Sequence, residues 1–385
     1  MKPELIAFSE NVLGGIQTYY LNLLTNCDET FQVNWLLLNH SGEIRAKAPL
    51  YSLENTKINY NVNYGRWRRA KQISKYLTKR PGIVLANREF ELDCLALYPC
   101  KSKTIYHIVH DEYYIQFAIR YCEIIDIYIA HNSFIFKQLI AMLPEREKDI
   151  VFLPFGVRLS PFHRQSNLDR KLTLVFIARL DKSKGILDLP LIDDILLKNK
   201  VEVNWTIIGD GTEKENFLNL IKDKKNFKCI VAKDDLEIFK EAQFGDIFIL
   251  PSLHDGTPVA LLESMSAGLV PIIYNFNDGI KDVVTEEVGY IVDKGDVNAF
   301  SNRILFLNSN REILEEKSIN AIKSAEKNYD VKNRAREYYS FFKNFEKHKK
   351  PHNYTPEKPS FRENPFIPQF FINYIILTFR YLKKI

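Results

Sequence analysis

The stretch that decides the fold is residues 247–268, which read IFILPSLHDGTPVALLESMSAG. Its first four residues, 247–250, are all apolar, and such a short run predicts a buried strand of a parallel sheet. A polar loop follows, and then Thr257 and Pro258, which are typical of an N-cap and of the first position of a helix. We therefore expect strand, loop and helix in succession, the repeating unit of an α/β sheet.

The same alternation continues on both sides of this stretch, with short apolar runs separated by helical patterns. It predicts βαβ units and, over 385 residues, two doubly wound domains whose ligands bind at the carboxyl ends of the strands. The polar segment 158–171 is the expected linker between them. The expected strands are 5–8, 33–38, 83–86, 104–109, 127–130 and 151–154 in the first half, and 174–177, 205–208, 229–232, 247–250, 270–273 and 289–292 in the second.

Two carboxylates flank the expected helix start: Asp255 precedes it and Glu263 lies inside the helix. The first helical amides, those of Val259 and Ala260, have no partner within the helix, and the positive end of the helix dipole suits a phosphate. Gly256 allows the backbone to approach a ligand closely. The pattern indicates a site in which the two carboxylates bind hydroxyl groups on both sides of a diphosphate. An ordinary strand–turn–helix with solvated acids is the alternative.

Two cations, Arg179 and Lys184, follow the expected strand 174–177. At a strand end they suit a diphosphate and the charge that develops as it leaves; a charged surface loop is the alternative. Glycine turns at 14–15 and 209–211 also follow strands and suit a close approach of phosphates. Plain turns explain these glycines equally well.

The strand 104–109 ends in a run of ionisable residues, His110, Asp111 and Glu112. Because side chains alternate along a strand, His107 and His110 point to opposite faces, and His110, last before the loop, is the better candidate for the binding edge. Histidine and carboxylate side chains are also the types that bind zinc, but the sequence shows no third ligand nearby. The alternative to a functional His110 is a histidine that serves only the structure.

The composition excludes several classes of protein. Residues 341–385 carry nine Lys or Arg against three Asp or Glu, a local charge of +6 that exceeds the net charge of +5. The remainder of the chain is therefore near neutral, which argues against a nucleic-acid binder. The five cysteines form no CxxC pair, which favours reduced thiols over a disulfide framework or a zinc site. We expect neither a signal peptide nor a membrane span, because no apolar run reaches ~18–20 residues.

Taken together, these pieces resemble the retaining nucleotide-sugar glycosyltransferases of family four, the glycosyl transferases group 1, which have the GT-B fold. The similarity covers about residues 5–345. It implies two Rossmann-like doubly wound domains facing a central cleft: an acceptor-binding domain at 1–165, a donor-binding domain at 170–330, and a helix at 331–350 that packs back toward the first domain. The matching residues are Gly14-Gly15, His110-Asp111, Pro154 to Val157, Arg179 with Lys184-Gly185, Gly209 to Gly211, and Asp255 through Glu263.

The resemblance implies a role for each matching residue. Glu263 binds the ribose, and Asp255, standing where the family has glutamate, contacts the donor sugar with a carboxylate one methylene shorter. The Gly15 amide faces the phosphates. The implied catalytic residues are His110, beside the transferred sugar, Arg179 and Lys184, the diphosphate clamp, and Asp255. The implied donor-binding residues are Gly14, Gly15, Arg179, Lys184, Gly209, Gly256, Thr257, Pro258, Val259 and Glu263.

The implied reaction is a retaining transfer, of the hexosyltransferase type, from a UDP-, GDP- or ADP-sugar to a glycan. No cofactor is expected, and the lack of a strict Asp-x-Asp pair in the sequence favours a metal-independent enzyme. Two alternatives remain: a nucleotide-sugar epimerase on the same fold, and a non-catalytic nucleotide-sugar-binding subunit.

The basic C-terminal tail is not explained by the resemblance. Residues 351–365 are rich in proline and predict a linker, and 366–385 are apolar and aromatic with a basic end. This pattern favours an amphipathic helix in a membrane interface, with a helix packed on the protein's own core or a partner subunit as the alternative. A second basic–aromatic patch is 66–71. We therefore expect a cytoplasmic protein, peripheral on the inner face of the cytoplasmic membrane. Its expected acceptor is a lipid-linked glycan in the synthesis of lipopolysaccharide or another bacterial surface polysaccharide.

Overall fold

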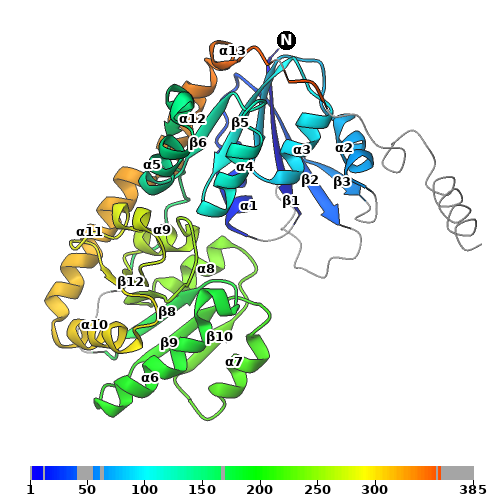
Figure 1. The fold of residues 1–385 in the computed structure, drawn as a ribbon. Helices are drawn as coiled ribbons and strands as arrows, with labels where there is room; N and C mark the ends of the chain where they lie inside the picture. The colour runs from blue at the N-terminus through cyan, green and yellow to red at the C-terminus, as the bar shows by residue number, and fades with distance from the viewer. Residues whose placement is uncertain are drawn as a thin grey trace, which may run out of the picture. The chain divides into compact units, whose positions relative to one another are not determined.

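The computed structural model describes residues 2–11, 14–40, 55–60, 65–165, 170–352 and 354–356. The chain divides into two units, each drawn in Figure 1 with a parallel sheet flanked by helices. The first comprises Met1–Ala130, Gln138–Val151 and Tyr339–Ile385, and the second comprises His131–Lys137 and Phe152–Tyr338. The expected membrane-interface helix, 366–385, lies outside the described residues.

The first unit holds a seven-stranded sheet of order β3-β2-β1-β4-β5-β6-β7. Strands β1, β4, β5 and β6 are buried along almost their whole length, as expected for a parallel sheet covered on both faces. The strand order reverses at β1 and β4, so ligands are expected at their carboxyl ends. The strands are β1 (Glu4–Glu10), β2 (Gln32–His40), β3 (Asn55–Tyr60), β4 (Gly82–Ala86), β5 (Lys103–Val109), β6 (Ile127–Ala130) and β7 (Ile150–Phe152).

Helices connect these strands and complete the unit. They are α1 (Gly15–Thr25), α2 (Arg66–Ser74), α3 (Glu89–Leu97), η1 (Glu112–Tyr114), α4 (Ile115–Arg120), α5 (Ser133–Met142), η2 (Pro144–Asp149) and α13 (Phe345–His348). The C-terminal segment from residue 339 also belongs to this unit, so the helix Val331–Phe342 crosses from the second unit into the first. Hydrogen bonds join this segment to the rest of the first unit. The Tyr339 hydroxyl donates to the Leu23 carbonyl oxygen at 3.1 Å, and the Thr104 hydroxyl donates to the Phe345 carbonyl oxygen at 2.9 Å.

The second unit holds a six-stranded sheet of order β10-β9-β8-β11-β12-β13, parallel throughout. Its order reverses at β8 and β11, which places the loops after these two strands side by side. The strands are β8 (Thr173–Ile177), β9 (Asn204–Ile208), β10 (Phe227–Ile230), β11 (Ile247–Leu250), β12 (Val270–Tyr274) and β13 (Tyr290–Val292). The helices are η3 (Lys182–Lys184), η4 (Ile186–Asp188), α6 (Leu189–Lys198), α7 (Lys214–Leu220), α8 (Asp235–Ala242), α9 (Val259–Ser266), η5 (Asp278–Asp282), α10 (Val297–Ser309), α11 (Arg311–Tyr329) and α12 (Val331–Phe342).

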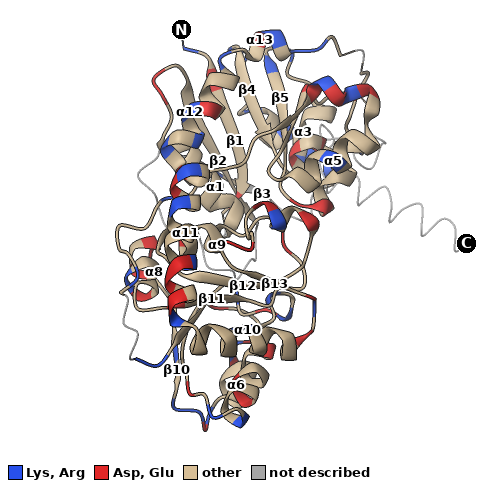
Figure 2. Ribbon diagram, turned by 90° about the vertical axis from the view of Figure 1, so that its left-hand side faces the viewer, with Lys and Arg blue, Asp and Glu red and all other residues tan. Residues whose placement is uncertain are grey.

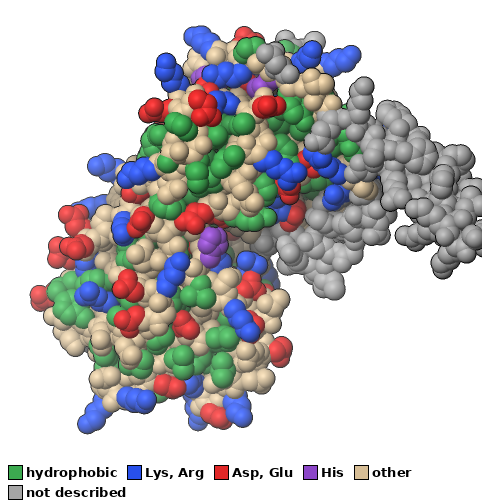
Figure 3. Space-filling view, in the orientation of Figure 1, with side chains coloured by type: hydrophobic (Ala, Val, Ile, Leu, Met, Phe, Trp, Pro, Cys, Tyr) green, Lys and Arg blue, Asp and Glu red, His purple; other side chains and the backbone are tan. Residues whose placement is uncertain are grey.

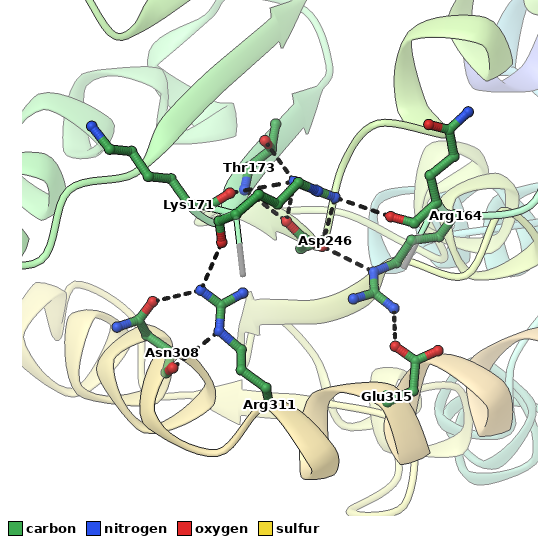
Figure 4. Close-up of polar contacts among 9 residues, drawn as sticks. Arg164, Lys171, Thr173, Asp246, Asn308, Arg311 and Glu315 are labelled. Carbon is green, nitrogen blue, oxygen red and sulfur yellow. Dashed lines mark hydrogen bonds and ion pairs between the residues drawn. The ribbon is translucent and has the colours of Figure 1, made fainter. Parts of the chain in front are cut away.

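A network of ion pairs stabilises this sheet at the amino ends of β8 and β11, the edge opposite the carboxyl ends of the strands (Figure 4). The buried Asp246 accepts from Arg164 Nε at 3.0 Å and from both terminal nitrogens of Arg170 at 2.7 and 2.9 Å. The Thr173 backbone amide donates to the same carboxylate at 2.8 Å, and Arg164 also pairs with Glu315 of α11 at 2.7 Å. The carboxylate of Asp246 is buried, and it is paired with two arginines and a backbone amide. We therefore assign this cluster a structural role.

Some expected elements differ from the structure; the expected single helix 331–350, for example, is two helices, Val331–Phe342 and Phe345–His348. Strand β10 lies over Phe227–Ile230, two residues before the expected 229–232, because the Phe227 ring stacks on Trp205 of β9 with ring centroids 5.2 Å apart. Strand β3, of sequence NTKINY, was not expected, since it alternates polar residues with few apolar ones.

On the face drawn in Figure 3, charged side chains of both signs are interspersed, and Figure 2 marks the positions of Lys, Arg, Asp and Glu along the ribbon. Among the helices that the structure describes, none combines the length and the apolar character that crossing a membrane requires.

Candidate functional site

The loops that follow β8 and β11 touch through their backbones. Gly185 has a φ of +72°, and a Cβ atom there would lie 2.0 Å from the Pro251 carbonyl oxygen. The buried Ser252 adds a hydroxyl bond to the Ser183 carbonyl oxygen at 3.1 Å, and the Leu253 amide donates to the same oxygen at 2.9 Å. The two loops therefore form one fixed surface at the carboxyl edge of the sheet.

This surface brings two of the expected charged residues together. Lys184 Nζ lies 2.5 Å from Asp255 Oδ2, and both side chains are largely covered. Arg179, by contrast, is 62% exposed and pairs with Asp181 at 2.7 Å. Lys184 and Asp255 thus form a preformed pair, while the guanidinium of Arg179 remains open to a ligand.

Helix α9 begins one residue later than the sequence indicated. The expected N-cap was Thr257, but the structure places Pro258 at this position and Val259 at the first helical one. Pro258 is extended, with ψ 126°, and its carbonyl accepts from the amides of Leu261 and Leu262 at 3.2 and 3.4 Å. No described residue caps this helix start with its side chain. Within the described part of the chain, the amides of Val259 and Ala260 also have no backbone acceptor. They are available to an anion.

Glu263 is the most unusual group in this region. Its side chain is on the buried face of α9, with the residue 6% exposed, and its Oε1 has no hydrogen-bond partner among the described residues. Burial raises the pKa of this carboxyl well above its usual value, and the negative charge of Asp235 adds to the effect. A buried acid with an open oxygen is stabilised by a hydrogen-bond donor from a ligand.

Asn277 was missed by the sequence analysis. Its Nδ2 donates to the carbonyl oxygens of Asp255 and Gly256 at 2.7 and 3.0 Å, and its Oδ1 accepts from the Ile280 amide at 3.1 Å. It therefore fixes the loop before α9 from the end of the neighbouring strand β12. Its position just after a strand was a usable signal, but a lone asparagine there is also typical of a turn.

The two expected glycine turns differ in whether their surroundings leave room for a Cβ atom. A Cβ at Gly209 would lie 2.0 Å from the Ala178 carbonyl oxygen, so the close approach of two strand ends already explains this glycine. Gly14 is the N-cap of α1, and among the described residues a Cβ there would meet only the Gln17 side chain, at 3.0 Å. Gly15 is the first residue of that helix.

His110 lies at the carboxyl end of β5 in the first unit. Its ring packs on Tyr114 with centroids 4.1 Å apart, and its Nε2 lies 3.8 Å from Asp111 Oδ2. Its Nδ1 is 2.9 Å from Asn87 Nδ2. His107 is fully buried, and burial lowers the pKa of its imidazole to about 4.

A second polar cluster in the first unit was not predicted. Arg88, just after β4, forms an ion pair with Glu10 at the end of β1. The buried Glu91 accepts from the amides of Asn87 and Arg88 at 2.6 and 2.8 Å, and burial raises the pKa of its carboxyl to about 7. These groups lie where the strand order of this sheet reverses. A sequence pattern does not reveal them because they come from separate strand ends.

Comparison with known proteins gives a family match and several distant relatives. Residues 160–328 match the family described as Glycosyl transferases group 1, as the resemblance predicted. An uncharacterized glycosyltransferase of Haemophilus influenzae is 29% identical over 161 residues, 40% of this chain and 44% of that protein. A UDP-Gal:alpha-D-GlcNAc-diphosphoundecaprenol alpha-1,3-galactosyltransferase of Escherichia coli is 30% identical over 119 residues, 30% of each chain. The matches thus span less than half of these relatives.

Solved structures are similar over a larger share of the chain. The Anabaena protein Alr3699/HepE, solved with UDP and glucose, has a TM-score of 0.72 at 13% identity, covering 89% of this chain and 99% of that one. The lipopolysaccharide outer core galactosyltransferase WaaB has a TM-score of 0.66 at 19% identity, covering 89% and 98%. At these identities the likeness concerns the fold alone. It confirms the expected α/β fold with two parallel-sheet domains of the GT-B kind.

Proposed function

Because residues 160–328 belong to the glycosyl transferases group 1 family, we propose that this protein transfers a sugar from a nucleotide-diphosphate sugar to a glycan acceptor. The observation that carries the proposal is the buried carboxyl of Glu263 with its open Oε1. A ribose hydroxyl is the kind of donor that such an oxygen requires.

The diphosphate of the donor is bound by the neighbouring positive groups. Lys184 and Arg179 supply full charges, and the amides of Val259 and Ala260 supply the partial charge of the helix end. On donor binding, the phosphates compete with Asp255 for Lys184. The released carboxylate then accepts a hydrogen bond from a hydroxyl of the donor sugar.

The reaction is a retaining transfer that needs little covalent chemistry from the protein. The bond from the anomeric carbon to the leaving phosphate oxygen breaks, and the acceptor hydroxyl attacks from the same face. Its proton passes to the departing phosphate oxygen. Arg179 and Lys184 stabilise the charge on that oxygen without a metal ion, which is catalysis by fixed electrostatics. The proposal also assigns binding roles to two parts of the first unit: His110 donates a hydrogen bond to a sugar hydroxyl, and the backbone of the Gly14–Gly15 turn binds a phosphate.

The acceptor is a lipid-linked glycan of a bacterial surface polysaccharide. The support is the relative from Escherichia coli, whose name specifies a diphosphoundecaprenol acceptor, and a second relative named for amylovoran biosynthesis. The tail 366–385 holds the protein at the inner face of the cytoplasmic membrane, and its pattern of aromatic and basic residues supports this role. A UDP-sugar is the first donor to test, since a similar fold was solved with UDP.

The test is turnover of UDP-, GDP- and ADP-sugars by the purified chain, with a membrane lipid extract as acceptor and Glu263→Ala as control. Release of one nucleoside diphosphate that depends on the lipid and is lost in the variant supports the proposal. Consumption of a donor regardless of lipid indicates an epimerase instead. Absence of both turnover and donor binding indicates a non-catalytic subunit.

A further inference from the structure

The carboxamide of Asn87 is directed at His110. Asn87 follows β4 and is buried, with Nδ2 lying 2.8 Å from the Ile108 carbonyl oxygen and 2.9 Å from His110 Nδ1. Because a carbonyl oxygen only accepts, the carboxamide atom facing Ile108 must be the nitrogen. This fixes the orientation of the carboxamide. One N–H bond then points to Ile108 and the other to His110 Nδ1.

This contact determines where the imidazole carries its proton. His110 Nδ1 accepts from Asn87, so it holds no proton itself. A neutral imidazole has one N–H group, which must therefore be on Nε2. Protonation of Nδ1 would set an N–H group against the N–H group of Asn87, so the contact disfavours an N–H group on Nδ1.

The surroundings hold both partners in this arrangement. The Asn87 amide donates to Glu91 Oε2 at 2.6 Å, which ties the residue to the first turn of α3. Tyr114 packs against the imidazole with centroids 4.1 Å apart and restrains the plane of the ring. The His110 side chain is 21% exposed. Asn87 thus takes up Nδ1, and Nε2, which lies 3.8 Å from Asp111 Oδ2, is the ring atom that carries the N–H group.

We propose that Asn87 is a positioning residue that keeps His110 as the neutral Nε2–H tautomer. In this form His110 donates a hydrogen bond to a hydroxyl of the sugar substrate, and it does not act as a proton acceptor. The identity of the hydroxyl-bearing ligand rests on the proposed function. The tautomer itself rests only on the contacts of Asn87.

The first test reads the tautomer without any substrate. The full chain is labelled with ¹⁵N-histidine, and His110→Gln assigns the ring resonances. The expected result is a protonated Nε2 and an unprotonated Nδ1 in the native protein. Asn87→Asp replaces the donor by an acceptor and moves the proton to Nδ1 or charges the ring. A native His110 protonated at Nδ1 would overturn the proposal.

The second test reads the consequence for transfer. Asn87→Asp is expected to lower kcat about tenfold or more, with the KM for the nucleotide sugar changed by less than about threefold. The matched control is Asn199→Asp, which removes an exposed hydrogen bond from the Asn199 carboxamide to the Ile195 carbonyl oxygen. This variant is expected to leave kcat and KM unchanged. A rise in KM alone, or a loss explained by a lower Tm, contradicts a positioning role.

A third variant keeps the proposal testable if Asn87→Asp does not fold. Asn87→Ala removes the donor without adding charge, and it is expected to populate both tautomers. An unchanged tautomer in this variant would show that Asn87 does not set it. The proposed function and the proposed tautomer of His110 can be contradicted independently. A native protein without turnover contradicts the proposed function, whereas the ring resonances still decide the tautomer.

Discussion

Lys184 Nζ lies 2.5 Å from Asp255 Oδ2, so two residues expected to bind the donor are bonded to each other in the free protein. The pair neutralises both charges on the joined surface formed by the loops after β8 and β11. A diphosphate carries more negative charge than one carboxylate and competes effectively for the lysine. Donor binding is therefore an exchange of partners, and the released Asp255 becomes available to the sugar.

Asp255→Asn tests this exchange. The substitution keeps the shape of the side chain but removes the charge that holds Lys184. We expect the free nucleoside diphosphate to bind about 3–10-fold more tightly, because the lysine no longer has to leave a carboxylate. Turnover is expected to fall about tenfold or more, since the sugar loses an acceptor. Titration calorimetry and initial rates measure the two effects, and weaker nucleotide binding would contradict the exchange.

Glu263→Gln tests the effect of this acid on nucleotide binding separately from its effect on thermal stability. The pKa of this carboxyl is raised in the folded protein, so the native state binds more protons than the unfolded state above the unfolded pKa. The stability that the acid contributes therefore falls as the pH rises through this window. We expect the variant to gain about 2–4 °C in Tm at pH 8 and little at pH 4, while losing nucleotide binding.

Thermal unfolding at the two pH values, together with nucleotide titration, checks this prediction. An equal change in Tm at pH 4 and pH 8 would mean that ionisation of Glu263 does not matter. Retained nucleotide affinity would remove the carboxylate from the binding site. The conservative substitution is needed because Glu263→Ala also creates a cavity, which lowers stability for a different reason.

Asn277→Ala tests the loop before α9. The change removes the hydrogen bonds to the carbonyls of Asp255 and Gly256. We expect a loss of about 1–2 kcal/mol in the free energy of unfolding and a KM for the donor raised about tenfold, because the loop is no longer fixed. Asn216→Ala, in an exposed helix, is the control. A variant with lower stability and an unchanged KM would show that Asn277 serves only the fold.

The sequence predicted the strands better than the contacts between them. A continuous apolar run bounded by turn residues, such as 247–250, is consistent with a buried parallel strand, and that strand was predicted to the residue. The helix start at Val259 was missed by one position, because proline suits both the N-cap and the first turn. Asn87 and Asn277 were not recognised. Each follows a strand as a turn residue does, and its role depends on a strand end far away in the sequence.

Gly185 offers a test of how closely the two loops must approach. Its φ of +72° resembles the +79° of Gly295, but a Cβ at Gly185 would lie 2.0 Å from the Pro251 carbonyl oxygen, whereas one at Gly295 meets no atom of the described residues within 4 Å. Gly295→Ala therefore measures the backbone strain alone, about 1–2 kcal/mol. Gly185→Ala adds the clash, so we expect it to lower the free energy of unfolding by at least about 2 kcal/mol more. It also displaces Lys184 and weakens nucleotide binding. Equal losses in urea unfolding for the two variants would mean that the loops can separate without consequence.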